Sequence, residues 1–449
     1  MRTLVLTVGC SPAPIATCVT ALRPDRVVFL CSSASRHLVD GDGQPCEHDA
    51  EHDAAPGSPC LLRQLNPRDY EIVELADPDD ATECYLRTTR VLDTLRTQPG
   101  AEILADYTGG TKTMSACLVA AALDRRIPLY LTSRDRTHLR SVGADSCSER
   151  VETVAIHANR ALTAWVPGLL ETYDYQGALR LLQRLQAEDH LRDETRGRVG
   201  LLQNVCGALE AWDRFDHALA RKLLGHRWQH PLVQGLCHRL DRLMAARAEI
   251  DGQPAESSPS HHGYELVWDL VLNARRRAAQ GRYDDAVGRL YRALELLAQV
   301  RLLTAYGIKT ASVDPQVIPA EVRSEIIGGR SADPLHGGIP VGLFASYRLL
   351  SGFTDDPVGA RFLPQAWSLR QALEARNFSL FAHGFRPLDE EGYSRFSAVA
   401  GQFLNECLRD LTDADLPPQL PGALPDLTSI SPQPTRTGNL RGEQVILQP

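Results

Sequence analysis

The sequence has no excess of positive charge and no long hydrophobic run. Its 449 residues carry a net charge of −8, with a pI near 6.0. Because a broad nucleic-acid-binding surface requires a basic field, any contact with nucleic acid must come from a local patch. The most apolar helix-like run, Met114–Leu123, is about half as long as a bilayer crossing requires. We therefore expect a cytoplasmic protein with no membrane span.

The sequence also lacks the cysteine spacing of a disulfide-stabilised protein. Its 11 cysteines are scattered from Cys10 to Cys407, without the short, even intervals of a disulfide framework. Reduced thiols in a cytosol are therefore expected. The apolar stretch Leu4–Val8 is too short for a secretory signal, so a strand is predicted there.

What is present in the first third of the chain is an alternation of strand-like and helix-like segments. The clearest helices are expected over 82–97 and 111–125. The apolar runs of strand length are 3–8, 26–32, 71–75, 102–108 and 127–133. This alternation predicts a doubly wound, Rossmann-like parallel sheet. The acidic segment 40–59, with its glycines and prolines, is predicted to be a surface insertion between the second and third strands.

After about Arg150 the strand pattern fades and helical spacing dominates. The segment 248–263 interrupts that spacing and predicts a linker. Two similar phrases, from Tyr173 and from Tyr283, are interpreted as two ordinary helix starts, because a pair is too few for a solenoid. The predicted domains are an α/β domain over 1–148, an all-α connector over 149–250, a linker over 251–263, a second all-α domain over 264–413, and a disordered Pro-rich tail over 414–449.

Two polar loops are expected at the same edge of the predicted sheet. The first strand ends in VGCSP (8–12), and a later strand ends in DYTGGTK (106–112) before a helix. Ligands of open α/β sheets bind beyond the carboxyl ends of the strands, where the strand order reverses. Glycines permit a close backbone approach, a helix start attracts phosphate, and Lys112 adds a positive charge. This chemistry suits an oligonucleotide backbone; a Gly-Gly turn that only connects a strand to a helix is the alternative. The phosphate-binding patterns GxxxxGK[ST] and GxGxxG are absent, which disfavours NTP hydrolysis.

The segments DYTGGTKTMSA (106–116) and VGCSP (8–12) resemble the ligand-binding signature of the CARF domains of CRISPR-associated proteins. The resemblance covers about the first third of the chain and implies that a cyclic oligoadenylate binds in the groove of a CARF dimer. It also implies that Ser11 and Lys112 are candidates for slow cleavage of that activator. By position, the ligand contacts that it implies are Gly9, Cys10, Ser11, Thr108, Gly109, Gly110, Thr111 and Lys112.

A second group of polar residues lies in the segment 366–385, which is predicted to be helical. Seven residues along a helix correspond to about 20° of rotation and about 10 Å of rise, so Arg376 and His383 are expected on one face. A metal-free ribonuclease needs a proton-transfer group that works near pH 7 and a cation over the phosphate. His383 suits the first role and Arg376 the second. By itself, such a pair is far more typical of a solvated helix face than of a catalytic site.

The segment RNFSLFAH (376–383) resembles the R-x(4-6)-H motif of HEPN ribonuclease domains, with six residues between Arg376 and His383. The resemblance implies a helical domain that pairs as a homodimer, with both motifs in one cleft. Together the two resemblances imply a type III CRISPR ribonuclease of the CARF/HEPN family that is activated by cyclic oligoadenylate. Such an enzyme would cut single-stranded RNA with Arg376, His383 and Asn377, without a metal or other cofactor. Two alternatives remain: a CARF-containing regulator or interaction protein without nuclease activity, and a ring nuclease that acts on the activator alone.

A stripe of charge lies on the predicted helix that begins at Asp285. Arg289, Arg292 and Glu295 are three residues apart, and they could orient the catalytic pair or grip RNA. An ordinary exposed charge stripe is the favoured interpretation.

The acidic insertion holds residue types that bind zinc, namely Cys46, His48, His52 and Cys60. Their spacing matches no common zinc finger, and a flexible acidic loop accounts for the composition. No metal site is therefore predicted.

Overall fold

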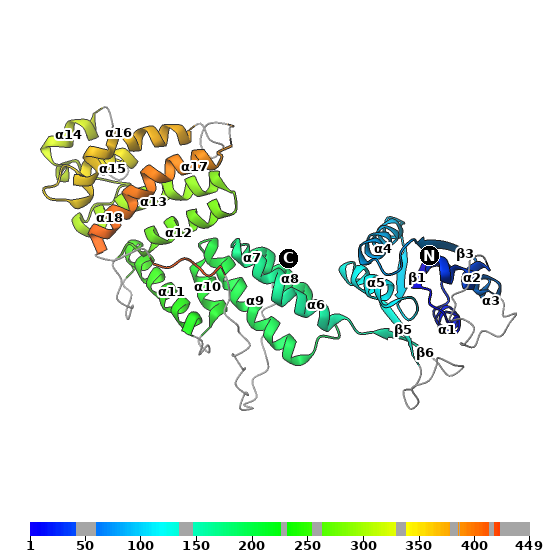
Figure 1. The fold of residues 1–449 in the computed structure, drawn as a ribbon. Helices are drawn as coiled ribbons and strands as arrows, with labels where there is room; N and C mark the ends of the chain where they lie inside the picture. The colour runs from blue at the N-terminus through cyan, green and yellow to red at the C-terminus, as the bar shows by residue number, and fades with distance from the viewer. Residues whose placement is uncertain are drawn as a thin grey trace, which may run out of the picture. The chain divides into compact units, whose positions relative to one another are not determined.

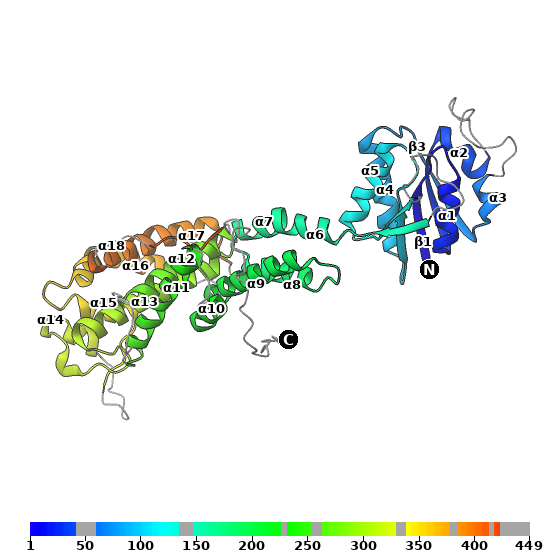
Figure 2. The ribbon, with the colours of Figure 1, turned by 90° about the horizontal axis from the view of Figure 1, so that it is seen from below.

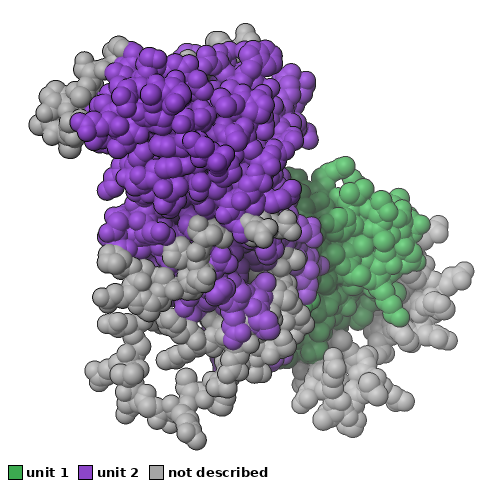
Figure 3. Space-filling model, turned by 90° about the vertical axis from the view of Figure 1, so that its left-hand side faces the viewer, with its two compact units in different colours: residues 1–159 green, residues 160–449 purple. Residues whose placement is uncertain are grey.

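The computed structural model describes residues 1–41, 60–133, 147–225, 231–253, 263–328, 338–377, 385, 387–412 and 417–422. The chain divides into two compact units, Met1–Asn159 and Arg160–Pro449 (Figure 3). The first unit therefore extends about ten residues beyond the predicted end of the α/β domain, and the second unit holds the rest of the predicted connector together with the second helical domain. No helix in the described ranges is long and apolar enough to cross a membrane.

The first unit is built on one sheet, in which the described residues form six strands. The strands are β1 (Arg2–Thr7), β2 (Arg26–Ser32), β3 (Asp69–Leu75), β4 (Glu102–Asp106), β5 (Leu129–Ser133) and β6 (Cys147–Val151). Their order is β3-β2-β1-β4-β5-β6, with β6 antiparallel to β5 and all other pairs parallel. The predicted doubly wound sheet is confirmed.

Helices cover both faces of this sheet, because successive strand side chains point to opposite sides. The helices are α1 (Ala13–Leu22), α2 (Ser33–Asp40), α3 (Leu61–Leu65), α4 (Ala81–Arg96) and α5 (Lys112–Asp124). On one face, Val5 and Val28 pack with residues of α4 and α5; on the other, Leu4 and Phe29 pack with residues of α1, α2 and α3 (Figures 1 and 2). The apolar runs of the sequence are continuous because the central strands are buried on both sides.

Three elements of this unit were not predicted. The last strand predicted from the sequence ends at Ser133, but β6 follows over Cys147–Val151 as an edge strand whose residues are half-buried or exposed. Helices α2 and α3 flank the acidic insertion, of which residues 42–59 lie outside the described part of the chain. Short elements with a polar outer face give too weak a periodicity to be recognised.

The second unit is helical, as predicted. Its helices are α7 (Val166–Glu171), α8 (Tyr175–Gln186), α9 (Asp193–Asp213), α10 (His217–Leu224), α11 (Pro231–Ile250), α12 (Glu265–Ala279), α13 (Tyr283–Tyr306), α14 (Ala320–Ile327), α15 (Leu343–Leu350), α16 (Pro357–Asn377), α17 (Glu390–Phe396) and α18 (Gln402–Thr412). Helix α6 (Val154–Arg160) spans the division between the two units.

The same tight turn joins three pairs of these helices, α7 to α8, α9 to α10 and α12 to α13. In each turn one residue has a positive φ, namely Tyr173 (56°), Phe215 (67°) or Gly281 (70°). The backbone N–H of the residue after it bonds back to the preceding helix, as Asp216 does to the Ala211 carbonyl at 2.9 Å. This geometry satisfies carbonyls at the end of the first helix and starts the next helix two residues later. Two of these turns correspond to the phrases noted at Tyr173 and Tyr283, and the turn at Phe215 was missed.

Two further expectations about the second unit need correction. The helix expected over 366–385 is α16, which starts at Pro357 and whose described part ends at Asn377; Phe385 is not helical and is exposed. Residues 417–422, expected to belong to a disordered tail, are packed against helices, with Leu420 only 1% exposed.

Candidate functional site

The two loops with the CARF-like sequence leave the sheet side by side. Strands β1 and β4 are parallel neighbours, with Leu6 opposite Asp106, so both chains emerge at one edge. The chain continues from β1 to β2 on one side and from β4 to β5 on the other, which makes this the point where the strand order reverses. Ligands of open α/β sheets bind at this position.

Glycines let these two loops touch backbone to backbone. A Cβ atom on Gly9 would lie 2.7 Å from the Gly110 nitrogen, and one on Gly109 would lie 2.4 Å from the Thr7 carbonyl oxygen. Gly110 has a φ of +83°, a conformation that other residues rarely adopt. The orientation of the Gly109 carbonyl is fixed, because its oxygen accepts hydrogen bonds from the Thr7 and Ser115 hydroxyls at 2.6 and 2.7 Å. The glycines are thus required by the packing of the loops, whether or not a ligand binds there.

A buried carboxylate supports the second loop from below. Asp106 is 2% exposed, and its Oδ1 accepts from the Thr108 backbone N–H at 3.0 Å. The Thr108 hydroxyl in turn accepts from the Thr132 N–H at 2.7 Å, which ties the loop to the end of β5. Burial raises the pKa of Asp106 above its ordinary value, and the hydrogen bond from Thr108 opposes that rise. These bonds fix the loop before any ligand arrives.

Two helix N-termini flank the loops. Helix α5 is capped by Thr111, whose hydroxyl accepts from the Met114 N–H at 3.2 Å and donates to the Pro78 carbonyl at 2.7 Å. Helix α1 begins after Pro12 and has no side-chain cap. Helix N-termini favour anions, and Lys112 stands exposed in the first turn of α5. Cys10 and Ser11 are also exposed, so this edge presents chemistry that suits phosphates.

The helical candidate residues lie at and beyond the end of α16. Arg376 and Asn377 are the last two residues of this helix, and the structure describes their backbone but not their side chains. His383 lies outside the described residues, so a shared face for Arg376 and His383 stays a prediction.

The helix that carries Arg376 is firmly anchored at its other end. Phe362 of α16 stacks on Tyr347 of α15 with ring centroids 5.2 Å apart, and Tyr347 also packs edge-on against Phe403 of α18. Arg361 forms ion pairs with Glu406 and Asp410 of α18. These contacts fix where α16 starts and in which direction it runs.

The predicted charge stripe on α13 is only partly a surface feature. Arg292 is exposed and bonds to Glu295 and Gln299 at 3.4 and 3.0 Å, as an ordinary stripe would. Arg289 differs, because it lies half-buried with its guanidinium 5.8 Å from the Phe215 ring. Because Arg289 is half-buried against this ring, its interpretation as an exposed charge was wrong, and the same burial lowers its pKa.

A buried polar network on α12 was missed by the sequence analysis. Asp269, Asn273, Arg276 and Arg277 are all less than 10% exposed, although they carry strongly polar groups. They recur at intervals of four, three and one among the apolar residues of this helix, and this pattern was visible in the sequence. Buried polar side chains need partners, so the pattern indicated a contact with other polar residues.

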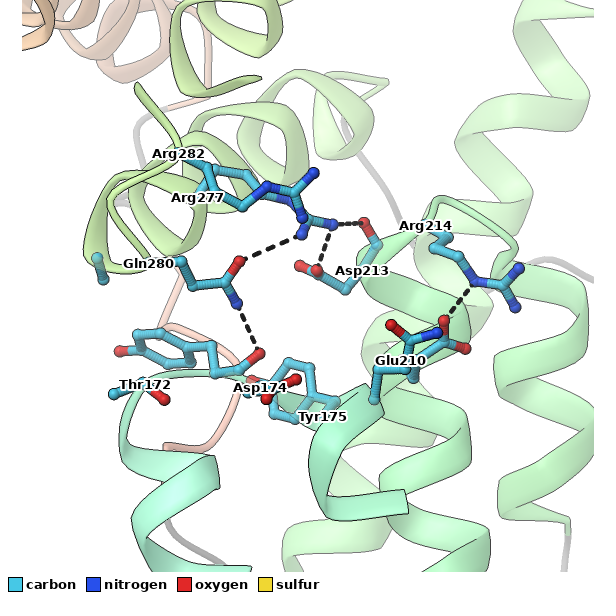
Figure 4. A pocket seen from close by; sticks show the side chains of 12 residues that line it. Thr172, Asp174, Tyr175, Glu210, Asp213, Arg214, Arg277, Gln280 and Arg282 are labelled. Carbon is cyan, nitrogen blue, oxygen red and sulfur yellow. Dashed lines mark hydrogen bonds and ion pairs between the residues drawn. The ribbon is translucent and has the colours of Figure 1, made fainter. Parts of the chain in front are cut away.

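Part of this network borders a cavity of about 640 Å³ (Figure 4). Figure 4 shows Arg277 pointing toward Asp213 and Gln280. The shortest contact between Arg277 and Asp213 is 2.6 Å, and Gln280 accepts from Arg277 and donates to the Tyr173 carbonyl. On another wall Arg214 pairs with Glu210 at 2.7 Å. These lining arginines are thus already paired with carboxylates, so the cavity offers a phosphate little attraction.

The described residues contain no group of three or more His, Cys, Asp or Glu side chains that could hold a metal ion. Among the zinc-type residues of the acidic insertion, Cys60 belongs to the described residues and Cys46, His48 and His52 do not.

Comparison with known proteins assigns the helical region. Residues 256–406 match the family model described as the Csm6 HEPN domain. This chain is a Csm6-like protein. The CRISPR system endoribonuclease Csm6 of Thermus thermophilus is 26% identical to it over 422 residues, which cover 88% of this chain and 83% of that protein.

The fold of the Csm6-like chain also matches a solved structure along most of its length. Csm6 of Enterococcus italicus, bound to cyclic hexa-2'-fluoro-hexa-dAMP, superimposes with a TM-score of 0.51 at 15% identity. The match covers 92% of this chain and 95% of that one. The predicted family and the predicted order of an α/β domain followed by helices are confirmed.

Proposed function

We propose that this Csm6-like chain is a cytoplasmic endoribonuclease of type III CRISPR antiviral defence that cuts single-stranded RNA when a cyclic oligoadenylate binds its α/β domain. The observation that carries the proposal is the Csm6 HEPN match over residues 256–406, on the same chain as an α/β unit with two glycine loops at its switch point. The name of the Thermus relative and the ligand of the Enterococcus structure agree with these two roles.

In the proposed sensor site the activator's phosphates lie over the two loops at the carboxyl edge of β1 and β4. The N-termini of α1 and α5 supply backbone N–H groups, and Lys112 supplies a full charge. The residues proposed to contact the ligand are Gly9, Cys10, Ser11, Thr108, Gly109, Gly110, Thr111 and Lys112.

In the proposed cutting site the RNA supplies its own nucleophile, the 2′-hydroxyl next to the scissile phosphate. The 2′-oxygen bonds to phosphorus and the P–O5′ bond breaks, so that one product ends in a 2′,3′-cyclic phosphate and the other in a 5′-hydroxyl. His383 takes part in moving a proton off the 2′-hydroxyl and onto the departing 5′-oxygen, Arg376 stabilises the charge that develops on the phosphate, and Asn377 adds a polar contact. One chain supplies one such set, so a homodimer that pairs two sets completes the cleft. This chemistry needs no metal, and cleavage should persist in excess EDTA.

The decisive experiment is an RNA-cleavage assay with a fluorescent single-stranded substrate and a panel of cyclic oligoadenylates of different ring size. We expect cleavage with one ring size and little without activator. Activator binding without RNA cleavage at any ring size would contradict the proposal and favour a regulator. Loss of the activator itself, with the RNA intact, would instead identify a ring nuclease.

A further inference from the structure

A short segment after α18 crosses several helices of the second unit. We call residues 417–422 the clasp. Its central side chain, Gln419, accepts a hydrogen bond from Arg276 and donates one to the Leu272 carbonyl at 3.0 Å, both on α12. The next residue, Leu420, is 1% exposed. The clasp is therefore held by the side chains of a half-buried glutamine and a buried leucine, and not only by its backbone.

The clasp also bonds to helices that precede α12. Arg239 of α11 donates to the Pro418 carbonyl, and the Tyr175 hydroxyl at the start of α8 donates to the Pro421 carbonyl at 3.1 Å. One six-residue segment thus connects α8 and α11, in the predicted connector, with the first long helix of the Csm6 HEPN match.

Arg276 lies where the clasp meets the connector. Its side chain is fully buried, and its Nε donates to Asp213 Oδ1, at the end of α9, at 2.8 Å. Asp213 also accepts from Arg277 and from the Asn273 amide. The Asp213 carboxylate is therefore shared among three side chains. The second hydrogen bond of Arg276, from its Nη1, goes to Gln419.

A second set of bonds lies along the same helix. Asp269 accepts from Trp212 Nε1 at 3.0 Å and contacts His217 Nε2 at 3.1 Å. Trp212 and His217 belong to α9 and α10, so α12 is tied to the connector at two levels. Leaving a buried guanidinium without one of its partners is strongly unfavourable. If Gln419 leaves Arg276, the contact between Arg276 of α12 and Asp213 of the connector is therefore expected to weaken as well.

We propose that the clasp sets how rigidly the connector helices hold α12, and that Gln419 and Arg276 are positioning residues through which the connector controls the nuclease domain. The structural part of this inference stands by itself, and its effect on RNA cleavage rests on the proposed function. Helix α12 is the natural point of control because it packs along α13, which in turn contacts α15, α16, α17 and α18.

The test compares full-length Gln419→Ala with full-length Pro418→Ala. The second variant is the matched control, because the Pro418 side chain is exposed while its carbonyl, which Arg239 uses, is kept. Amide hydrogen exchange is measured along α12, and RNA cleavage is measured with and without the cyclic oligoadenylate that activates wild-type protein. For Gln419→Ala we expect exchange in α12 to rise about 5- to 30-fold and the ratio of activated to basal cleavage to fall, at unchanged activator affinity.

A conservative variant separates positioning from general damage. In Gln419→Glu the carboxylate still accepts from Arg276 but cannot donate to Leu272, and we expect it to recover most of the activation ratio. If amide hydrogen exchange along α12 is the same in Gln419→Ala as in Pro418→Ala, the proposal that the clasp holds α12 is wrong. Faster exchange with an unchanged activation ratio would overturn the positioning role. If wild-type protein cleaves no RNA with any activator, the proposed function fails, and the exchange comparison alone decides the clasp.

Discussion

His383 and Arg376 carry the chemistry of the proposed ribonuclease, because an imidazole exchanges protons near neutral pH and a guanidinium stabilises phosphate charge. We expect His383→Ala and Arg376→Ala each to lower the rate of RNA cleavage at saturating activator by about 100-fold or more. Initial rates measure this, and activator affinity should stay at the wild-type value.

The matched control for the arginine is Arg370→Ala. Arg370 is exposed on the same helix, with its guanidinium 5.1 Å from the Phe344 ring. Its loss removes one charge from α16 without touching the proposed motif. If Arg370→Ala and Arg376→Ala slow cleavage equally, the positive charge of the helix matters in general and the motif does not.

Asp106 gives the first unit a pH dependence of definite sign. Its pKa is raised by burial, so the folded state disfavours the ionised form. The free energy of unfolding should therefore fall as the pH rises from about 4 through the folded pKa. In Asp106→Asn this contribution is absent. Urea denaturation of both proteins between pH 4 and pH 8 should show the variant gaining stability, relative to wild type, as the pH rises.

Asp93 provides a control of opposite sign. It is an exposed carboxylate whose pKa is lowered by a two-pronged hydrogen bond from Arg125, at 2.7 and 2.9 Å. Asp93→Asn should therefore lose stability, relative to wild type, as the pH rises. A stability difference for Asp106→Asn that is the same at every pH would show that burial does not govern this carboxyl.

At the scale of elements, the turns at Phe215 and Gly281 have the same geometry but different residues at the N-cap of the helix that follows. Asp216 caps α10 by accepting from the Leu219 N–H at 3.0 Å, whereas Arg282 occupies the same position before α13 and makes no side-chain cap. We expect Asp216→Ala to lower the free energy of unfolding by about 1 kcal/mol. Arg282→Ala should lower it less, since it removes only an exposed ion pair with Asp285. Chemical denaturation of the two variants checks this, and equal losses would mean that the cap is not what stabilises the turn.

The elements that the sequence predicted share one property: their periodicity comes from burial. Strands such as β2, buried along nearly its whole length, produce continuous apolar runs, and α5 produces a helical pattern between clear end signals. The edge strand β6, with the sequence CSERV, has no apolar face to produce an alternation. The clasp was missed for a related reason, because Gln419 and Leu420 are fixed by distant helices and not by a local pattern.

Only those parts of the candidate site that lie in short sequence motifs could be predicted. The loops 8–12 and 106–112 were placed together correctly, because parallel strands that are neighbours end at the same edge. The reason for their glycines was not foreseeable, since the 2.4 Å approach to the Thr7 carbonyl involves residues about 100 positions apart in the chain. Asp213 and Arg276 also lie far apart in the sequence, and only the fold brings them within 2.8 Å.

At the scale of the whole molecule, activation requires that the ligand distinguish two states of the protein. A ligand shifts an equilibrium only by the difference in its affinity for those states. Because different residues are proposed to bind the activator and to cleave RNA, mutation should affect the two activities separately. Lys112 belongs to binding alone in the proposed function. Lys112→Ala should raise the activator concentration for half-maximal cleavage by about tenfold, the effect of one charge-assisted hydrogen bond, while the maximal rate at saturating activator stays near wild type.

The matched control is Arg96→Ala, which removes a charge of the same sign from the last turn of α4. This turn precedes β4 and lies near the amino ends of the parallel strands, away from the two loops at their carboxyl ends. Activator titrations of RNA cleavage on the two variants distinguish a local contact from the general field of the first unit. Equal shifts would assign the effect to that field. No shift for Lys112→Ala would mean that the Gly-Gly loop only connects β4 to α5, and the activator would then have to bind elsewhere on the unit. A lower maximal rate at saturating activator would show that Lys112 itself distinguishes the two states, so that sensing and binding share one side chain.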